Sequence, residues 1–497
     1  MGKFKRVLVV GGGSAGWITA AYLDAVLNGI GKARDPVVSI SLVESAKIGR
    51  IGVGEATIPS IRLTLQRIGI SEADVMTATE ATFKHGIRFC DWNGPGHSYF
   101  HPFDRRQAGR FDPTGVNWML SDRSVPFSDL VSVQPRLALS DRAPKSADMP
   151  DYEGELGYAY HLNAEALADL LARVATGRGV EHIEGKITGV ALRGTLGHVD
   201  HVVLEDGRKL GADLFIDCSG FAAVLIEKAL KTPFRDDSKW LPCDRAVTMQ
   251  IPYQDGETAR PYTTATAMAS GWRWEIGLKS RRGTGYVYSS AYCSDSEAEE
   301  ALRKENGEAD LPVRILQFPV GRRVQAWVGN VVAIGLSAGF IEPLESTGLY
   351  LVEKAVLHLS ENFPFGGVEN AEPLRSRFNE LTAREYDELL PFVALHYVIA
   401  QRSDTPFWQD AKSEERIPDR LRTLLKLWEC KPPSASDFDF WDGCFFAENY
   451  EYILYGLGWH PANVRASTQM QPPRRSQVVE QALEQMLKNL PLHKDAL

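Results

Sequence analysis

A glycine-rich turn near the start of the chain constrains the fold more than any other feature. Residues 11–16 read GGGSAG, a GxGxxG pattern. It follows the β-branched run 6–10, which is typical of a strand buried in a parallel sheet, and it opens a stretch of helical apolar spacing, 15–27. A second strand-like run, 37–43, ends at Glu44. Strand, glycine turn, helix and strand form a βαβ unit, which predicts an α/β fold with a doubly wound sheet.

The same turn predicts a dinucleotide site. Gly11 permits the tight turn, Gly13 lets the backbone approach a pyrophosphate, and Gly16 lets the helix pack on the strand. The helix N-terminus supplies N–H groups, and the Glu44 carboxylate can accept the ribose hydroxyls of an adenosine. The alternative is a plain glycine turn followed by a surface glutamate. The predicted dinucleotide-binding residues are Gly11, Gly13, Ser14, Ala15, Gly16 and Glu44.

Two later strands favour FAD over NAD as the dinucleotide. Residues 212–217 form a buried strand that ends at Asp217 before a turn of small residues, and 331–334 form another that ends at Gly335. Flavoenzymes bring such strand ends to the FAD, so Asp217 and Gly335 join the predicted cofactor site. Ordinary flavin hydroxylases follow the third strand's glycine with an aspartate that binds the ribityl chain. Leu336 stands in that place here.

Composition excludes several classes of partner and site. The 497 residues include 55 Lys and Arg and 64 Asp and Glu, which gives a net charge of −9. A negative net charge does not favour binding to nucleic acid or to an anionic membrane. Six cysteines without a CxxC pair predict neither a metal site nor a disulfide framework. We find no signal peptide and no apolar run of about 18 residues. A cytoplasmic enzyme with a small-molecule substrate is therefore expected.

Length predicts roughly three folding units, and the patterns group them into two modules. A discontinuous FAD-binding module is expected over 1–92 and 151–364. A substrate-binding module of helices and loops is expected over 93–150 and 365–497. The first part of that module is rich in Gly, Pro, Asp and Ser, which favours long ordered loops.

Several motifs together resemble the flavin-dependent halogenases of the tryptophan halogenase family. The resemblance extends from Gly11 to about Leu457, and Gly277 stands where the family has a proline. It implies a flavin monooxygenase-like FAD domain with a helical substrate-binding module. The motifs are GGGSAGW from Gly11 to Trp17, GVGEATIPS from Gly52 to Ser60, Phe83-Lys84, Trp272-x-Trp274-x-Ile276, and GLSAGFIEPLESTG from Gly335 to Gly348.

The resemblance implies a reaction in two places. Reduced FAD and O2 oxidise chloride or bromide to hypohalous acid, which crosses a tunnel to the substrate. Lys84 matches the family's essential lysine and Glu345 its paired glutamate. A desolvated ammonium can hold hypohalous acid or form a haloamine, and a carboxylate can accept the proton of the arenium intermediate. Without the resemblance, Lys84 would be a surface lysine and Glu345 a first-turn helix acid.

The resemblance also implies where the halide binds and which loop lies beside the flavin. It places the halide at Thr347 and Gly348, where a helix over 349–359 begins and free amides could bind an anion. The alternative is ordinary helix capping by Ser346 or Thr347, and capping and halide binding can both hold at once. The motif from Gly52 to Ser60 resembles the family's flavin-side loop, so Gly54 and Ala56, together with Leu336, are expected at the cofactor.

Two tryptophans are expected to separate flavin and substrate. Trp272, Trp274 and Ile276 alternate along a strand, so they point to one face, and core packing is their simplest interpretation. In the family this tryptophan pair is thought to keep organic substrates away from the flavin. We therefore expect Trp272 and Trp274 to form a barrier.

The expected substrate is a neutral, electron-rich aromatic such as an indole. His101 and Phe103 resemble the family residues that line the aromatic slot. In the members that act on free tryptophan, a C-terminal segment binds the charged groups of the amino acid with a tyrosine pair and a glutamate. The corresponding segment of this sequence has Tyr450 but not the pair, and Leu457 stands about where the glutamate would be. Unpaired charges in a pocket are costly, so free tryptophan is expected to be a poor substrate.

Two other functions use the same strands and glycines. One is an FAD-dependent aromatic monooxygenase, a hydroxylase, against which Leu336, the Lys84 and Glu345 pair and the tryptophan strand all count. The other is a catalytically silent flavin-binding protein. As a halogenase, the chain is expected to take FADH2 from a separate NAD(P)H-dependent flavin reductase, and a homodimer is compatible with the resemblance.

Overall fold

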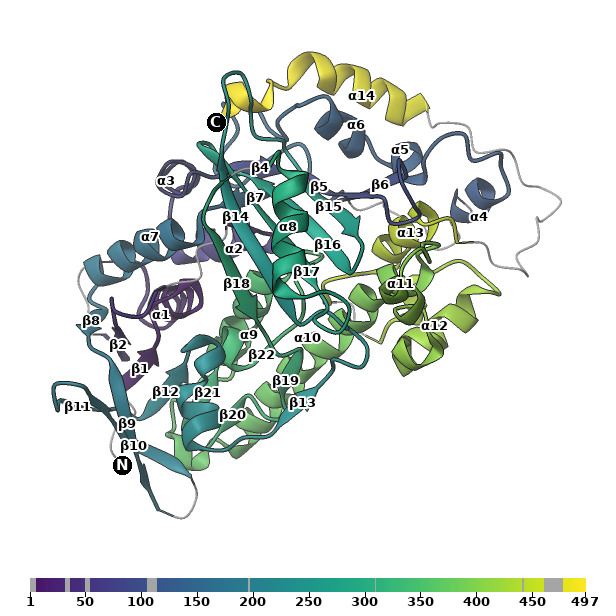
Figure 1. The fold of residues 1–497 in the computed structure, drawn as a ribbon. Helices are drawn as coiled ribbons and strands as arrows, with labels where there is room; N and C mark the ends of the chain where they lie inside the picture. Colours follow the sequence, from purple (N-terminus) through teal and green to yellow (C-terminus); the bar gives the residue numbers. More distant parts are fainter. Residues whose placement is uncertain are drawn as a thin grey trace. The chain divides into compact units, whose positions relative to one another are not determined.

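The computed structural model divides into two compact units, each built from three stretches of the chain (Figure 1). Unit 1 comprises Met1–Ala81, Leu162–Asp237 and Phe318–Tyr386. Unit 2 comprises Thr82–His161, Ser238–Gln317 and Asp387–Leu497. The residues that the structure describes are 6–31, 36–49, 54–104, 114–194, 197–308, 310–439, 442–459 and 477–497.

Unit 1 is built on a six-stranded sheet whose inner strands are parallel. Its order is β20-β21-β12-β1-β2-β8, and only the short edge strand β20 is antiparallel to its neighbour. Val10 pairs with both Val43 and Asp217, and Asp217 pairs with Ala333, so four strands end side by side. This confirms the predicted doubly wound α/β fold. The strands are β1 (Arg6–Val10), β2 (Ser39–Glu44), β8 (Glu181–Glu184), β12 (Leu214–Asp217), β20 (Trp327–Val328) and β21 (Val331–Ala333).

Helices pack on this sheet and on one another within unit 1. Helix α1 (Ser14–Leu27) begins directly after the glycine turn and contacts α7 (Ala164–Gly177) and α9 (Gly348–Glu361). Ten consecutive residues of α1 are buried, which explains why its apolar stripe is broad. The unit also contains α2 (Ser60–Ile68), α3 (Glu72–Ala78) and the antiparallel sheets β9 (Ile187–Arg193) with β10 (His198–Leu204) and β11 (Lys209–Gly211), and β13 (Phe234–Asp236) with β19 (Gly321–Arg323) and β22 (Gly339–Phe340).

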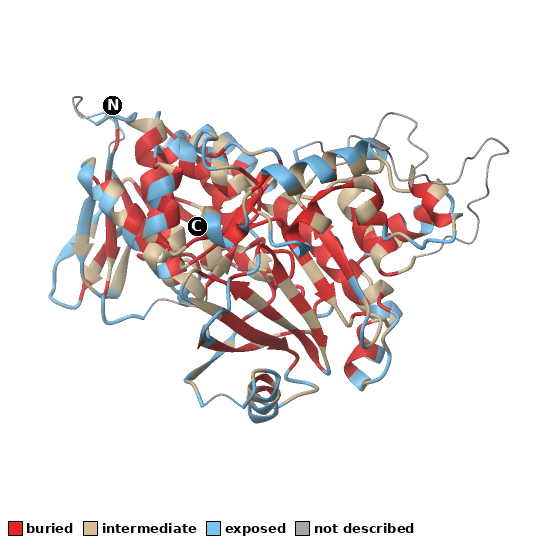
Figure 2. Cartoon of the chain, turned by 90° about the horizontal axis from the view of Figure 1, so that it is seen from above, coloured by how far each residue is buried: buried red, intermediate tan, exposed pale blue. Residues whose placement is uncertain are grey.

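Unit 2 contains a seven-stranded, mainly antiparallel sheet. Its order is β18-β14-β17-β16-β15-β5-β6, with one parallel pair, β15 and β5. Val247, Met249 and Tyr288 pack with residues of helix α8 (Asp295–Glu305) into a buried cluster on one face. Figure 2 colours the buried residues of the chain red. The strands are β5 (Gly86–Cys90), β6 (Ser98–Pro102), β14 (Arg245–Pro252), β15 (Thr263–Met268), β16 (Gly271–Gly277), β17 (Arg281–Tyr288) and β18 (Val313–Gln317).

The remaining elements of unit 2 are short strands and helices. Strand β4 (Thr82–Lys84) pairs antiparallel with β7 (Ala159–Leu162). The long helix α10 (Glu372–Ile399) begins in unit 1 and ends in unit 2. The other helices are α4 (Thr114–Met119), α5 (Phe127–Val131), α6 (Gln134–Leu139), α11 (Pro406–Asp410), α12 (Asp419–Trp428), α13 (Ala447–Gly456) and α14 (Gln477–Asn489).

Residues 93–150 differ from the expected long loops. They contain β6, α4, α5 and α6, whose five or six residues are too few to show a clear helical or strand period in the sequence. The compact units also divide the chain elsewhere than the predicted modules, since 238–317 groups with 82–161. The FAD-binding and substrate-binding assignments of those modules remain predictions.

Among the described helices, none has the length and apolar character to cross a bilayer.

Candidate functional site

The glycine turn in unit 1 has the geometry that its predicted role requires. Gly11 has φ +112°, and a Cβ there would lie 2.3 Å from the carbonyl oxygen of Cys218. A Cβ on Gly16 would lie 1.8 Å from the carbonyl oxygen of Gly11. Gly13 differs, because no heavy atom of the described chain lies within 4 Å of a Cβ placed on it. The turn therefore packs tightly at Gly11 and Gly16 and leaves open space at Gly13, which fits a diphosphate.

The N-terminus of α1 and the end of β2 supply polar groups beside that space. Gly13 is the N-cap residue of α1, and it has no side chain that could accept a hydrogen bond from the N–H groups of the first turn. Glu44 accepts a hydrogen bond from Trp17 Nε1 at 3.2 Å and lies 3.1 Å from His182 Nε2. Its carboxylate also lies against Gly12, where a Cβ would collide with it. These contacts fix the carboxylate at the glycine turn, and its predicted contact with a ribose remains a prediction.

The Asp217 side chain is engaged within unit 1. One carboxylate oxygen accepts from the backbone N–H and hydroxyl of Ser219 at 3.1 and 2.5 Å. The other accepts from the backbone N–H groups of Leu225 and Ile226, both at 2.8 Å. Four bonds use the acceptor capacity of a carboxylate. Any contribution of Asp217 to a cofactor site therefore comes through the strand end that it stabilises.

The third strand end, at Gly335, meets the glycine turn. Gly335 has φ +77°, and a Cβ there would lie 2.9 Å from the Cβ of Ala15 on α1. Leu336 follows and is half-buried. The Ser337 hydroxyl donates to the backbone carbonyl of Asp217. Unit 1 thus brings the predicted cofactor residues at Ala15, Asp217 and Gly335 into one place.

The N-terminus of α9 forms an open, polar cradle. Thr347 is the N-cap residue and is fully buried, and its Oγ1 has no hydrogen-bond partner among the described residues. A Cβ on Gly348 would meet no described atom within 4 Å. An unsatisfied hydroxyl and an open helix N-terminus suit an anion such as a halide. Because Thr347 Oγ1 caps no backbone group, the alternative of helix capping by this residue is wrong.

Glu345 lies just before this cradle. Its side chain is buried, and Ser346 after it has φ +63°. The helix begins only at Gly348, and its first turn contains no acidic residue. The alternative interpretation of Glu345 as a first-turn helix acid is therefore wrong, while its proposed chemical role remains a prediction.

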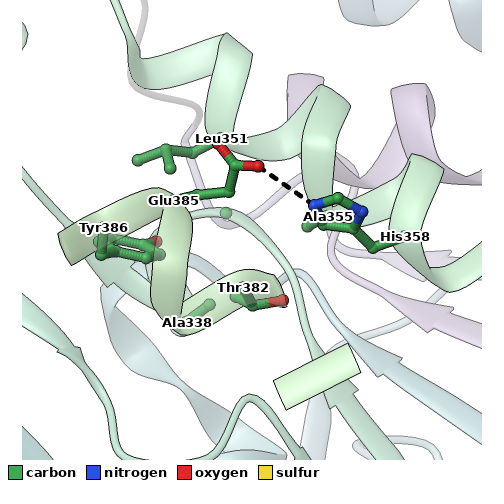
Figure 3. A pocket seen from close by; sticks show the side chains of 8 residues that line it. Ala338, Leu351, Ala355, His358, Thr382, Glu385 and Tyr386 are labelled. Carbon is green, nitrogen blue, oxygen red and sulfur yellow. Dashed lines mark hydrogen bonds and ion pairs between the residues drawn. The ribbon is translucent and has the colours of Figure 1, made fainter. Parts of the chain in front are cut away.

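A cluster of polar side chains that sequence reasoning missed joins α9 to α10. Figure 3 shows two of its members, Glu385 and His358. Glu385 accepts from the Tyr350 hydroxyl at 2.8 Å and lies 3.3 Å from both Lys354 Nζ and His358 Nε2. Burial alone would raise the pKa of Glu385, but the His358 hydrogen bond and the Lys354 charge keep it below its ordinary value. The sequence could have indicated this cluster, because Tyr350, Lys354 and His358 are spaced four residues apart and therefore lie on one face of a helix.

A small cavity of about 10 Å³ lies beside this cluster, with room for about one water molecule. Two polar atoms of the residues that line it, His358 Nδ1 and Thr382 Oγ1, have no partner among the described residues. The lining residues are Gly335, Ala338, Leu351, Ala355, His358, Thr382, Glu385 and Tyr386 (Figure 3).

Another face of α9 holds a second buried carboxyl group, that of Glu353. Glu353 accepts a hydrogen bond from the Thr64 hydroxyl of α2 at 2.8 Å. Burial raises the pKa of Glu353 to about 8. The helix whose first turn forms the cradle is therefore held by contacts to the ionised Glu385 and by the neutral carboxylic acid of Glu353.

Lys84 in unit 2 is buried. The residue has 0% exposure, and its Nζ lies 5.0 Å from the centroid of the Phe103 ring. Lys84 pairs with Ala159 of β7, two residues before His161. Burial, and then the Lys84 charge, hold the pKa of His161 well below its ordinary value. The alternative of a surface lysine is wrong, and Phe103 is brought beside Lys84.

The other predicted substrate residues lie in an aromatic cluster of unit 2. The His101 ring lies 5.8 Å from that of Phe392, and its Nε2 lies 2.9 Å from Asn449 Nδ2. The centroid of the Tyr450 ring lies 4.8 Å from that of Phe392, in an edge-on contact. Tyr450 also contacts Trp428 at 5.0 Å, and burial raises the pKa of its hydroxyl. The structure therefore brings His101 and Tyr450 together around Phe392, and their binding of a substrate remains a prediction.

The two tryptophans lie on the same side of β16. Their ring centroids are 6.3 Å apart, and Trp274 covers Gly285 of β17, where a Cβ would lie 2.0 Å from the indole. The Nε1 of Trp274 is buried and has no partner among the described residues. This geometry is that of core packing within unit 2. The barrier role of the pair remains a prediction.

The glycine at the family's proline position is closely packed. A Cβ on Gly277 would lie 2.9 Å from the Tyr253 hydroxyl and 3.0 Å from the Ala259 Cβ. Its carbonyl accepts a hydrogen bond from the Thr82 hydroxyl at 2.6 Å. A proline ring would therefore displace these neighbours, so glycine suits this packing.

The flavin-side loop is described in part. Gly52 and Val53 lie outside the described residues. Gly54 has φ +74°, and strand β3 (Glu55–Ala56) follows, with Ala56 buried. Contacts of Gly54 and Ala56 with a cofactor remain predictions. No cluster of three or more potential metal ligands occurs among the described residues.

Comparison with known proteins gives consistent matches along nearly the whole chain. Residues 6–473 match the tryptophan halogenase family. The tryptophan 6-halogenase SttH of Streptomyces toxytricini is 37% identical over 93% of this chain and 90% of its own. The tryptophan 7-halogenase RebH of Lentzea aerocolonigenes is 35% identical over 93% and 91%.

Solved structures match equally widely. A tryptophan halogenase from Shewanella frigidimarina superposes with a TM-score of 0.92 at 34% identity, covering 99% of this chain and 97% of that one. Tar14, a tryptophan C-6 flavin-dependent halogenase from taromycin biosynthesis, gives a TM-score of 0.90 at 36% identity and covers 99% of both chains.

Proposed function

Because this chain belongs to the tryptophan halogenase family and is a flavin-dependent halogenase, we propose that it transfers an oxidised halogen through Lys84 to the indole ring of its substrate. The observation that carries the proposal is the burial of Lys84, whose ammonium lies 5.0 Å over the Phe103 ring. Burying an ammonium is costly, so a buried lysine beside an aromatic ring is a strong candidate for a chemical role.

The residues of unit 1 fit FAD and a halide. This assignment is supported by the open space at Gly13, by the helix N-terminus beside it and by the Thr347 hydroxyl, which has no partner among the described residues. When bound, FADH2 supplies the electrons with which O2 and a halide X⁻ give hypohalous acid, in the balance FADH2 + O2 + X⁻ + H⁺ → FAD + HOX + H2O. A separate NAD(P)H-dependent flavin reductase delivers the FADH2. The residues proposed to hold FAD are Gly11, Gly13, Ser14, Ala15, Gly16, Glu44, Gly54, Ala56, Asp217, Gly335 and Leu336, and those proposed to hold the halide are Thr347 and Gly348.

Lys84 receives the hypohalous acid. Its ammonium donates a hydrogen bond to the acid, or its neutral amine takes the halogen as a haloamine and releases water. The substrate ring attacks the halogen, and Glu345 accepts the proton that leaves the ring carbon. The sum is ArH + HOX → ArX + H2O, so the chain returns to its starting state.

The substrate is proposed to carry an indole ring. SttH and RebH are named as tryptophan halogenases, which favours tryptophan itself. This runs against the expectation that free tryptophan binds poorly, which rested on Leu457. We therefore propose tryptophan as the first substrate to test, with free indole as its matched competitor. Equal concentrations of both, offered together, would give mostly halogenated tryptophan if the relatives are the better guide.

The test of the proposed function is halide dependence. The enzyme is supplied with a flavin reductase, NADH, FAD and the two indoles, with chloride, with bromide or with neither, and products are identified by mass spectrometry. Halogenated indole that forms only with a halide supports the proposal. A hydroxylated product without halide would instead establish the aromatic monooxygenase, and flavin oxidation with no modified product under any condition would establish the silent flavin-binding protein.

A further inference from the structure

The strand that carries Lys84 is held by a residue far along the chain. Strand β4 lies at the edge of its small sheet, next to β7. The backbone N–H of Phe83, the residue before Lys84, donates to the Nε2 of His493 at 3.1 Å. An imidazole therefore takes the place of a neighbouring strand as the acceptor for this N–H.

The hydrogen bonds of His493 define its protonation state. Its Nδ1 lies 2.9 Å from the carbonyl oxygen of Ala259, which only accepts, so Nδ1 carries the proton. Nε2 must then be the unprotonated nitrogen that accepts from Phe83. His493 is 1% exposed, and burial lowers its pKa to about 4, so the ring stays neutral near pH 7.

The segment 490–493 is itself fixed to unit 2. Leu490 is buried in a cluster with Leu137 and Leu483, which joins α14 to α6. Three hydrogen bonds then attach the segment to residues 141–143: Arg142 Nη1 to the Leu490 carbonyl at 2.9 Å, Ala143 N to the Pro491 carbonyl at 3.0 Å, and His493 N to the Asp141 carbonyl at 2.7 Å.

The residues on both sides of Lys84 have comparable anchors. The Thr82 hydroxyl donates to the Gly277 carbonyl at 2.6 Å. The His85 backbone N–H donates to the Pro261 carbonyl at 2.8 Å. Residues 82, 83 and 85 are thus each tied to another part of unit 2, and the bond to Phe83 depends on a side chain.

We propose that His493 is a positioning residue for Lys84, which it places over Phe103 by accepting the Phe83 N–H. This inference rests on the proposed function of Lys84. Without the acceptor, the Phe83 N–H would be buried and unpaired, so β4 would shift to find another partner. Displacing a reacting group by about 1 Å can cost about 10²-fold in rate.

Two substitutions separate positioning from packing. In His493→Gln, the amide oxygen can take the place of Nε2 and accept from Phe83. In His493→Asn, the shorter side chain can replace only Nδ1 and its bond to Ala259. We expect H493Q to keep the halogenation kcat within about threefold, and H493N to lose about tenfold to 10²-fold, with the KM for halide and indole and the rate of flavin oxidation unchanged.

Hydrogen exchange followed by mass spectrometry gives a readout independent of activity. In H493N the amide of Phe83 should exchange faster in peptides spanning 82–85, and in H493Q it should stay protected. Wild-type kcat and wild-type protection in H493N would overturn the inference. Equal losses of kcat in H493N and H493Q, with Phe83 protected in both, would also overturn it.

Lys84→Met, assayed in parallel, separates this inference from the proposed function. Halogenation by K84M would refute the function of Lys84 itself, whereas an inactive K84M beside a fully active H493N would refute only the positioning role. If H493N does not fold, Arg142→Met tests the same inference, because it removes the Arg142 hydrogen bond to the 490–493 segment and keeps the His493 side chain. We expect the loosened segment to expose the Phe83 amide, so R142M should exchange faster at 82–85 than the wild type and should lower kcat more than H493Q does. Wild-type exchange together with a kcat no lower than that of H493Q would overturn the proposal.

Discussion

The buried titratable groups beside the two proposed reaction sites are of opposite kinds. In unit 1, the helix that begins at the halide cradle carries Glu353, an acid whose pKa burial raises to about 8. In unit 2, the strand that carries Lys84 is flanked by His85 and His493, bases whose pKa values burial lowers to about 4. Burial disfavours the charged form in both units, which leaves a neutral acid in one and neutral imidazoles in the other.

The difference lies in which buried side chains are neutral beside each proposed site. Unit 1 needs an electropositive helix N-terminus for an anion, and a neutral Glu353 adds no negative charge to that helix. In unit 2, the neutral His85 and His493 add no positive charge beside Lys84. We therefore expect charge changes in unit 2 to affect chemistry most. We expect titration of the buried groups in the two units to change the free energy of unfolding in opposite directions as pH rises.

Removing the Lys84 side chain should have the largest effect on activity. Lys84→Ala removes the group proposed to receive the halogen, so halogenation should fall by about 10²- to 10⁴-fold. FAD binding and flavin oxidation should persist, because the predicted flavin residues lie in unit 1. Product by mass spectrometry and flavin oxidation by absorbance check this, with the exposed Lys304→Ala as control. Wild-type product yield from K84A would refute the role of Lys84.

Glu345→Gln should have the next largest effect. The amide is of similar size but cannot accept the proton from the ring, so halogenation should fall by about 10²-fold while flavin oxidation is unchanged. The exposed Glu361→Gln on α9 is the matched control. Product formation at the wild-type rate in E345Q would remove Glu345 from the mechanism.

Glu353 should make the free energy of unfolding depend on pH between about 4.5 and 8. The unfolded chain releases this proton near pH 4.5 and the folded chain near pH 8, so the free energy of unfolding falls as pH rises between these values, by up to about 5 kcal/mol. Glu353→Gln keeps a neutral acceptor for Thr64 and should flatten this limb. Thermal unfolding at pH 6 and pH 9 measures it, and an E353Q curve parallel to wild type would contradict the assignment.

His493 should have a smaller effect in the opposite direction. The unfolded chain binds this proton near pH 6.5 and the folded chain only near pH 4, so the free energy of unfolding falls as pH drops between these values, by up to about 3 kcal/mol. His493→Gln should flatten this acid limb and leave the alkaline limb unchanged. A steeper acid limb in H493Q than in wild type would count against a neutral His493.

The features that could be predicted from the sequence are local ones. The βαβ pattern around Gly11 fixes the order of strand, turn and helix within about 40 residues, and the parallel sheet follows from it. The short helices within 93–150 could not be predicted, because five or six residues show no clear period. The bond between Phe83 and His493 spans 410 residues, and no local pattern marks the histidine as a partner of that strand.

The central claim is that Lys84 receives the oxidised halogen and passes it to the ring. Enzyme treated with FADH2, O2 and bromide in the absence of substrate, then freed of small molecules and given tryptophan without O2, tests this most directly. We expect up to one molecule of brominated tryptophan per chain of the wild type and none from Lys84→Met. As much product from K84M as from the wild type would contradict it.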